Sequence, residues 1–182
     1  MNMKKTFLAT ICLFAGMSIY AQQIDVQPVP QKVIPATQTI KLTGTYLLNG
    51  INDANPFAAE ALKTILGTSE SMKGGMKVFI GERGDKAVSK YKKFIPAQAE
   101  GYFVRISPKE IVLAGYDERG TYYAVQTFRQ LIENGQVPVT EITDWPDIRF
   151  RGVVEGFYGT PWSHEARLRH LKFYGQNKMN TY

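Results

Sequence analysis

Hydrophobic and polar positions repeat with different periods along the chain, and the changes of period mark its elements. Between residues 56 and 66 apolar side chains recur at helical spacing, which is typical of a helix with one buried face. Asn55 precedes this stretch as a helix cap, Pro56 suits the first turn, and Gly67 follows as a stop. The pattern predicts a helix whose inner face consists of Ala58, Ala61, Leu62, Ile65 and Leu66.

A second helical pattern runs from about Thr121 to Asn134, with Gly135 as its stop and with an inward face of Ala124, Phe128, Leu131 and Ile132. Strand patterns surround the two helices. Residues 24–50 are spaced by prolines and then alternate, which predicts irregular edge strands. "MKVFIG" and "VPVTEI" predict one short strand each, and "GYFVRISPKEIVLAG" predicts a hairpin that turns around Pro108. Residues 22–145 are therefore predicted to form an α+β domain.

The pattern changes at Trp145-Pro146, where the proline forces an extended or turning backbone. "FRGVVEG" has a nearly continuous apolar centre, as expected for a parallel strand covered on both faces. After the loop "GFYGTPW", Ser163 can cap a helix that Gly175 ends, with Leu168 and Leu171 pointing inward. "KMNTY" then begins a second strand. One such unit cannot bury its own apolar faces, so residues 146–182 are predicted to be the start of a truncated second domain.

The N-terminal residues have the order of a secretory signal peptide. Lys4 and Lys5 precede an apolar run that ends at the small residue Ala21. We therefore expect residues 1–21 to be removed and the protein to be exported, to the periplasm or as a secreted protein. Cys12 is the only cysteine and lies in this segment, so the exported chain is expected to rely on its core rather than on disulfides.

Composition indicates a soluble globular protein, with 44% hydrophobic and 21% charged residues and a net charge of +6. The densest basic stretch places Lys86, Lys90, Lys92 and Lys93 close together. Such runs are usually solvated faces, and export makes a nucleic-acid partner still less consistent with the sequence. Beyond the signal, no apolar run is long enough to cross a membrane.

The loop after "FRGVV" is rich in glycine and aromatic residues. Its glycine spacing does not match a dinucleotide fingerprint or a phosphate-binding loop. Gly156 can let a ligand approach the backbone, and Phe157, Tyr158 and Trp162 offer flat faces suited to sugar rings. Spacing alone leaves an equal alternative open, in which these aromatics are core packing and the glycines only turn the chain.

The stretch "FRGVVEGFYGTPWSHEARLRHLKFYGQNKMNTY" closely resembles the start of the catalytic barrel in glycoside hydrolase family 84. This family contains the O-GlcNAcase-like β-N-acetylglucosaminidases, named hyaluronidases in many bacteria. The preceding "EGYFVRI", "IVLAG", "GTYYAVQTFRQLI" and "ITDWPDIRFRG" resemble the N-terminal accessory domain that families 20 and 84 share. The resemblance implies an α+β accessory domain followed by the first β/α unit of an incomplete TIM barrel. "VEGFYGTPW" is the element that separates family 84 from family 20.

The resemblance also implies a retaining mechanism in which the substrate's own acetamido oxygen attacks the anomeric carbon and forms an oxazoline. Two adjacent aspartates assist that reaction in the family, and no adjacent pair of aspartates occurs in this sequence. The chain is therefore expected to contain no catalytic residue and to be inactive alone. Gly156, Phe157 and Tyr158 match the family's substrate-binding positions. The implied partner is a glycan or glycoprotein that contains N-acetylglucosamine, with no cofactor and no metal.

Other chemistries fit the sequence less well. Glu155 stands at a strand end like a catalytic carboxylate, but no partner carboxylate is close in sequence. His164 and His170 do not share a helix face, which argues against a metal site. Two alternatives to family 84 remain open: a family 20 type β-N-acetylhexosaminidase, and a non-catalytic carbohydrate-binding or interaction module.

Overall fold

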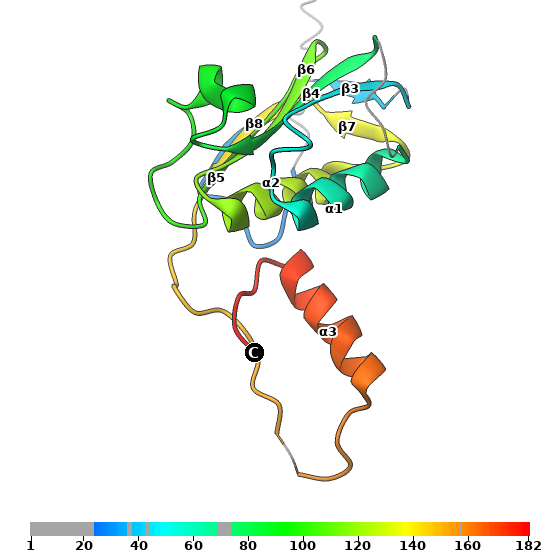
Figure 1. Cartoon of the computed structure of the whole chain (residues 1–182), viewed down its shortest axis with the longest axis vertical. Helices are drawn as coiled ribbons and strands as arrows, with labels where there is room; N and C mark the ends of the chain where they lie inside the picture. Colours follow the sequence, from blue (N-terminus) through cyan, green and yellow to red (C-terminus); the bar gives the residue numbers. More distant parts are fainter. Residues whose placement is uncertain (1–23, 36–37, 43, 69–73, 157) are drawn as a thin grey trace, which may run out of the picture.

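A computed structural model of the chain describes residues 24–35, 38–42, 44–68, 74–156 and 158–182. The predicted signal segment and Cys12 lie outside these residues, so export stays a prediction. The described residues form two regions, which Figure 1 shows one above the other. We name residues 24–145 the accessory domain and residues 146–182 the C-terminal unit.

The accessory domain contains one large mixed sheet and one small sheet. The large sheet has the order β1-β8-β5-β6-β4-β3, in which β6, β4 and β3 are parallel and the other neighbours antiparallel. Its strands are β1 (Lys32–Ile34), β3 (Tyr46–Asn49), β4 (Met76–Glu82), β5 (Tyr102–Ile106), β6 (Glu110–Gly115) and β8 (Thr140–Asp144). The small sheet pairs β2 (Thr39–Lys41) with β7 (Gln136–Pro138).

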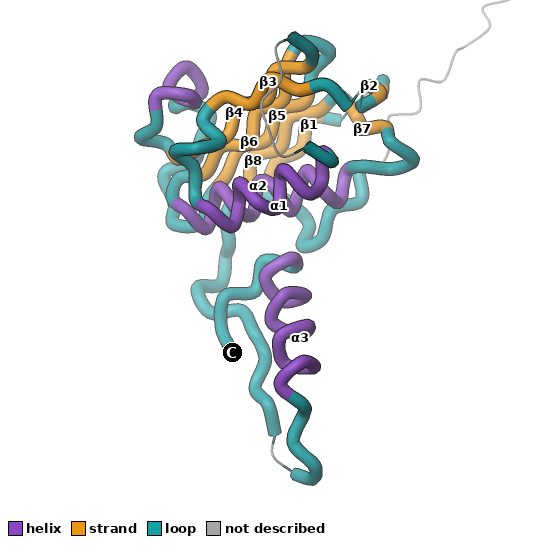
Figure 2. The backbone as a smooth tube through the Cα atoms, turned by 45° about the vertical axis from the view of Figure 1, so that its right-hand side comes forward, coloured by secondary structure: helices purple, strands orange, loops and turns teal. Residues whose placement is uncertain are grey.

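Two helices cover one face of the large sheet, as the tube in Figure 2 shows. They are α1 (Pro56–Leu66) and α2 (Glu118–Leu131), and the short 3₁₀ helix η1 (Lys86–Tyr91) covers part of the other face. The prediction for α1 is confirmed at both ends. The Asn55 side chain accepts from the backbone N–H groups of Phe57 and Ala58, and Gly67 is left-handed with a φ of 64°.

The predicted boundaries of α2 were wrong at both ends, because the helix also ends at Leu131 and not at Asn134. The helix begins at Glu118 because the Asp117 side chain caps it, accepting from the N–H of Gly120. Its inward face is as predicted, since Ala124 and Phe128 are completely buried against the sheet. The sequence pattern did not predict this cap because Asp117 lies in a polar stretch that precedes the apolar stripe.

The hairpin prediction is confirmed as β5 and β6, which pair antiparallel from Tyr102 opposite Gly115 to Ile106 opposite Ile111. The prediction of one strand for "VPVTEI" was wrong. The segment divides at Val139 into β7, which pairs with β2, and β8, which lies between β1 and β5. Pro138 cannot donate to a ladder, so a strand that contains it stays at an edge and the chain changes sheets there.

The C-terminal unit contains α3 (His164–Gln176), with the Ser163 side chain accepting from the N–H of Ala166 as its cap. The strand predicted for "FRGVVEG" is reduced to one parallel bridge, between Gly152 and Thr181. A two-stranded pair without further neighbours is marginal, which explains the short pairing. The helix continues past Gly175, the predicted end, by one residue.

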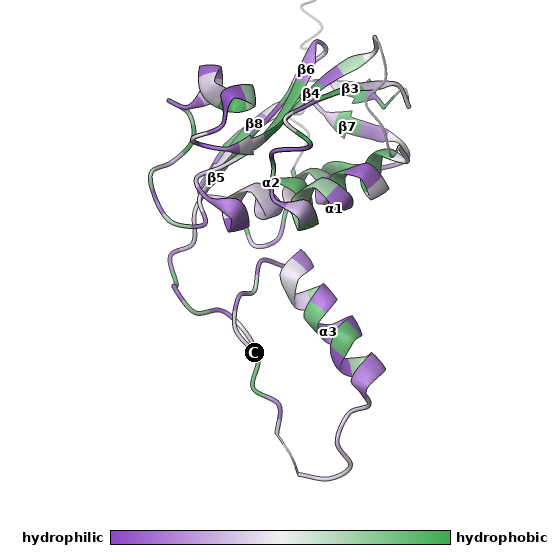
Figure 3. Ribbon diagram, in the orientation of Figure 1, coloured by the Kyte–Doolittle hydropathy of each residue, from purple (hydrophilic) through white to green (hydrophobic). Residues whose placement is uncertain are grey.

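The prediction that Leu168 and Leu171 point inward was also wrong, because they are 52% and 43% exposed. Figure 3 shows the same contrast along the whole chain: apolar colour gathers between the sheet and the helices α1 and α2, but lies open on α3. No element of the described chain covers that side of α3. Among the described residues, none of the helices has the length and apolar character to span a membrane.

Candidate active-site loop

Two segments of the C-terminal unit run side by side in the same direction. Residues 150–156 lead away from the accessory domain, α3 returns toward it, and residues 177–182 lead away again (Figure 1). The amino ends of both segments therefore face the accessory domain, and their carboxyl ends point to the far side. In an α/β barrel the carboxyl ends of the strands and the loops after them build the active site.

Gly156 and Tyr158 lie at this far end, in the loop that follows the first segment. Both are exposed, and the Tyr158 ring has no cover at all. A Cβ built on Gly156 would lie 3.1 Å from Cδ2 of Tyr158, so the ring stands directly beside the glycine backbone. Phe157, the third predicted binding residue, lies outside the described residues. Gly156 and Tyr158 thus share one surface, and their contact with a sugar stays a prediction.

Glu155 anchors the base of the loop. Arg167, in the first turns of α3, donates to both carboxylate oxygens, with Nε and Nη2 each 2.8 Å away. The hydroxyl of Tyr182 donates to Oε2. These bonds, Arg167 first and Tyr182 second, lower the pKa of Glu155 to about 2. A carboxylate that is ionised at neutral pH and bound by both Arg167 and Tyr182 holds these neighbours in place and has no proton to give.

A row of aromatic rings lies along one side of α3. Trp162 contacts His170 edge-on with ring centroids 4.3 Å apart, and Tyr174 follows at 6.0 Å from His170 and 6.3 Å from Tyr182. Trp162 therefore packs against the helix and does not project with Tyr158 from the loop. Of the residues described, no three that could ligate a metal form a cluster, and His170 belongs to this stack.

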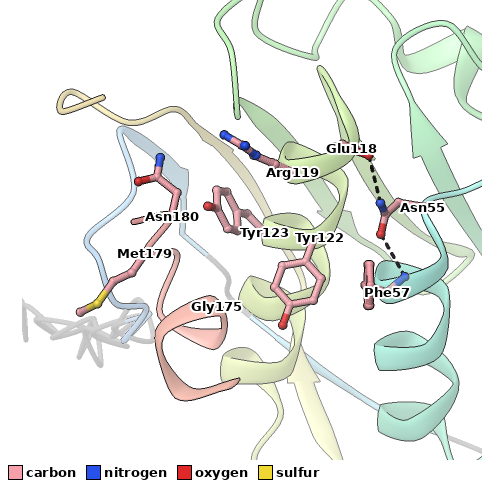
Figure 4. Close-up of a pocket in the computed structure, with 9 residues that line it drawn as sticks. All are labelled: Asn55, Phe57, Glu118, Arg119, Tyr122, Tyr123, Gly175, Met179 and Asn180. Carbon is pink, nitrogen blue, oxygen red and sulfur yellow. Dashed lines mark hydrogen bonds between the residues drawn. The ribbon is translucent and has the colours of Figure 1, made fainter. Parts of the chain in front are cut away.

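The opposite end of the C-terminal unit meets the accessory domain at a hollow of about 350 Å³. Figure 4 shows its wall, formed by the starts of α1 and α2 and by the turn after α3. Its polar side chains already have partners: Asn55 donates to Glu118 and caps α1, and Arg119 pairs with Glu100, which lies outside the hollow. The hollow has the size of a small-molecule site but lacks convergent polar groups directed at a ligand.

Beside this hollow, a buried polar junction connects the two regions. The Glu100 carboxylate accepts from Arg151 Nη2 at 2.5 Å, Asn180 Nδ2 at 2.9 Å and Arg119 Nη1 at 3.1 Å. Burial raises the pKa of Glu100, but the bonds from Asn180 and Arg151 outweigh burial, so that the net pKa is lowered.

Lys178 forms the second half of the junction. Its ammonium donates to the Tyr102 hydroxyl at 2.8 Å and lies 3.8 Å from Oδ2 of Asp144. Tyr102 also accepts from Thr127 and donates to Asp144 at 2.7 Å. Burial lowers the pKa of Lys178 to about 8, opposed by the charge of Asp144. Burial also raises the pKa of Tyr102 well above its ordinary value.

Comparisons with protein-family models divide the chain at the same place. Residues 23–145 match domain 2 of glycosyl hydrolase family 20. Through its accessory domain, the chain belongs to this domain family. Residues 151–182 match the β-N-acetylglucosaminidase family model. This arrangement, an accessory domain followed at once by the beginning of a catalytic barrel, is that of the N-terminal portion of a family 84 or family 20 type enzyme.

Solved structures agree with this assignment to the family 20 and 84 hexosaminidase group. The structure of CpGH84B is 30% identical with a TM-score of 0.77, over 87% of this chain and 29% of that one. The structure of CpGH84D has a TM-score of 0.74 at 21% identity, over 87% and 30%. The Flavobacterium johnsoniae chitobiase shares the fold at 16% identity, with a TM-score of 0.59 over 85% and 26%. The chain spans less than a third of each of these structures.

Sequence reasoning located the loop but missed the junction. Its residues are far apart in the sequence and match no catalytic or ligand-binding motif: Glu100, Arg151, Lys178 and Asn180. The available signal was indirect: "ITDWPDIRFRG" resembles the family at the border between domains, where no catalytic role explains its arginines.

Proposed function

We propose that this chain is the N-terminal portion of an exported, retaining β-N-acetylglucosaminidase that acts by substrate assistance. The supporting observation is the placement of Gly156 and Tyr158 at the carboxyl end of the first of two parallel segments. The same stretch matches the β-N-acetylglucosaminidase model, which agrees with a sugar-binding role for this end. The substrate is a glycan or glycoprotein that carries β-linked N-acetylglucosamine.

In this mechanism the acetamido oxygen of the substrate supplies the nucleophile, and the enzyme supplies orientation and proton transfer. An adjacent aspartate pair performs both tasks in the family, and this sequence contains no such pair. Glu155 does not replace it, because Arg167 and Tyr182 occupy its carboxylate and hold its pKa at about 2. A positioned acid contributes roughly 10²–10⁴-fold to such a reaction, so the 182-residue chain alone is inactive.

The loop residues have distinct roles in this proposal. Gly156 admits the sugar ring close to the backbone, while Phe157 and Tyr158 line the floor of the pocket. The ion pair between Glu155 and Arg167, together with Tyr182, fixes the base of the loop from three successive elements.

The activity test compares two proteins, the 182-residue chain and a version that continues through the aspartate pair, each with an aryl β-N-acetylglucosaminide. We expect turnover only with the longer protein. Turnover by the short chain after rigorous purification would place the chemistry elsewhere. An inhibitor that mimics the oxazoline and discriminates the two families' pockets separates family 84 from family 20. Sugar binding without hydrolysis in the longer protein would support a binding module instead.

The role of Gly156 is tested by Gly156→Val in the longer protein. Methyl groups at this site would occupy the space of the sugar ring, so kcat/KM is expected to fall by about a hundredfold. The melting temperature should hardly change, since the site is exposed. Gly84→Val is the matched control, because Gly84 is also exposed and no atom lies within 4 Å of its Cβ. Full activity of Gly156→Val at normal stability would show that this glycine only turns the chain.

A further inference from the structure

One carboxylate of the accessory domain contacts both parallel segments of the C-terminal unit. Glu100 lies just before β5 and its side chain is 8% exposed. It binds Arg151, which directly precedes Gly152, and Asn180, which directly precedes Thr181. Gly152 and Thr181 are the partners of the parallel bridge. The carboxylate therefore lies at the same level of both segments, one residue before their pairing begins.

The two segments also bind each other at this level. The backbone N–H of Arg151 donates to the Asn180 side chain at 2.9 Å, and the N–H groups of Asn180 and Thr181 donate to the Arg151 carbonyl at 2.8 and 3.0 Å. Val153 N–H donates to the Thr181 carbonyl at 3.3 Å. Glu100, Arg151 and Asn180 thus form a closed triangle of hydrogen bonds.

Gly152 excludes a pairing register that is shifted by two residues. A Cβ at this position would lie 1.7 Å from the Thr181 carbonyl oxygen, a distance no side chain tolerates. Arg149 lies two residues before Arg151, so a slip of two residues would still present an arginine to Glu100. That slip would bring Phe150 to the place of Gly152 and its Cβ into the Thr181 carbonyl. The charge of Glu100 would accept either Arg149 or Arg151, and the position of Gly152 allows only Arg151.

The backbone at the junction is held in an unusual conformation. Three non-glycine residues in the described ranges have a positive φ, and two of them, Glu100 and Lys178, meet here, each with a φ of 61°. The Glu100 N–H is held by Asp117 at 2.9 Å. Side chains seldom adopt this conformation without a compensating interaction, and such residues cluster where the structure imposes a geometry.

We propose that this side of the accessory domain is an assembly template for the barrel, on which Glu100 sets the register of the first two parallel strands. The template binds the starts of the two strands. Glu100 accepts from the Arg151 guanidinium and the Asn180 amide, and Asp144 faces the buried ammonium of Lys178. The template binds the amino ends of the two strands and, among the described residues, makes no contact with their carboxyl ends at Gly156 and Tyr182. This role is independent of the sugar that the enzyme takes.

Hydrogen exchange of the 182-residue chain tests the template. Glu100→Gln keeps the shape of the side chain but replaces one carboxylate oxygen by an NH₂ group, which then faces either Arg151 or both Asn180 and Arg119. The amides of Val153, Asn180 and Thr181 should exchange at least about tenfold faster, while those of β4, β5 and β6 keep their protection. Cross-strand NOEs between residues 152 and 181 should weaken in parallel, which reports register directly.

Glu110→Gln is the matched control. Glu110 also accepts two side-chain bonds, from Lys90 at 3.2 Å and Tyr91 at 2.6 Å, but both donors belong to η1 of the accessory domain. It should leave the three amides and the NOEs unchanged. Unaltered exchange in Glu100→Gln would overturn the proposal, and so would an equal loss of protection in the sheet.

If Glu100→Gln does not fold, Arg151→Lys and Arg149→Lys form a second pair of variants. Lysine keeps the charge at residue 151 but cannot bind Glu100, the Lys178 carbonyl and the Ile148 carbonyl at once, as Arg151 does. Only Arg151→Lys should speed exchange at Asn180 and Thr181. Equal effects of the two variants would show that charge alone, without a fixed register, holds the segments.

Discussion

The accessory domain and the C-terminal unit are held in place by different forces. In the accessory domain, Tyr46, Phe103 and Phe128 are nearly or completely buried, and apolar side chains fill both faces of the sheet. In the described part of residues 146–182, the only buried residue is a lysine, Lys178. The helix of this unit contributes no buried residue.

The difference shows how the two kinds of interaction divide their tasks. Apolar burial is non-directional and scales with area, so it stabilises the accessory domain without dictating single distances. Hydrogen bonds to buried charged groups are directional and costly to leave unmade. They therefore place the C-terminal unit accurately on the domain, although they cannot replace a core.

The sharpest way to break this comparison is a matched pair of phenylalanine truncations in the 182-residue chain. Phe128→Ala empties a completely buried site between α2 and the sheet, so the free energy of unfolding should fall by about 3–5 kcal/mol. Phe173→Ala removes a ring that is 56% exposed on α3, so the free energy of unfolding should change by less than about 0.5 kcal/mol. Chemical denaturation followed by circular dichroism measures both. Similar losses would mean that α3 has a core of its own.

A second test concerns the close approach of the two parallel segments. Gly152→Ala places a Cβ against the Thr181 carbonyl and should cost about 1–3 kcal/mol of local stability. The amides of Val153 and Thr181 should lose protection, while the sheet of the accessory domain keeps it. Gly84→Ala, in open space, is the control and should leave exchange unchanged. Retained protection in Gly152→Ala would show that the backbone shifts to make room.

The smallest expected effect comes from titrating Lys178. Its pKa is about 8 in the folded chain, against 10.5 for an exposed lysine. Between pH 8 and 10 the unfolded chain binds the proton that the folded chain has lost, so stability should rise with pH. The slope is at most about 1.4 kcal/mol per pH unit. Above pH 10 the trend should reverse, since folded Tyr102 and Tyr123, with a pKa of about 12 for Tyr123, keep protons that unfolded tyrosines release.

The groups that face the Lys178 ammonium are Tyr102, Asp144 and Arg151, from β5, β8 and the start of the first parallel segment. Urea denaturation at a series of pH values measures the effect. Trp145 serves as the reporter after Trp162→Phe, since the chain has two tryptophans. Lys178→Met should abolish the rise. A flat profile in the parent chain would mean that Asp144 keeps the lysine charged.

The sequence predicted the accessory domain well because its elements carry their own local signals. Asn55 and Gly67 mark the ends of α1 in any context, and the alternation in β5 and β6 follows from one buried face. The division at Val139 was missed because it depends on two different partners, β2 for β7 and β1 for β8, and both lie about a hundred residues away along the chain.

The C-terminal unit was predicted less well for a physical reason. The apolar pattern of Leu168 and Leu171 was taken as an inward face, but the described residues provide no surface to cover it. The loop residues Gly156 and Tyr158 could be proposed from the sequence because a family pattern surrounds them, and their role stays a prediction. Lys178 and Asn180 could not, since their partners Tyr102 and Glu100 are about eighty residues distant in sequence.

The pairing of β1 with β8 joins the first and last strands of the accessory domain. During synthesis the sheet therefore stays incomplete until Asp144 has been added, and Arg151 follows only a few residues later. Domains tend to fold in the order in which they are made. The finished sheet, with Glu100 and Tyr102 already in place at β5, is thus ready when the first barrel residues emerge. Because translation completes the accessory domain first, Arg151 and then Asn180 can each bind Glu100 on a domain that is already folded.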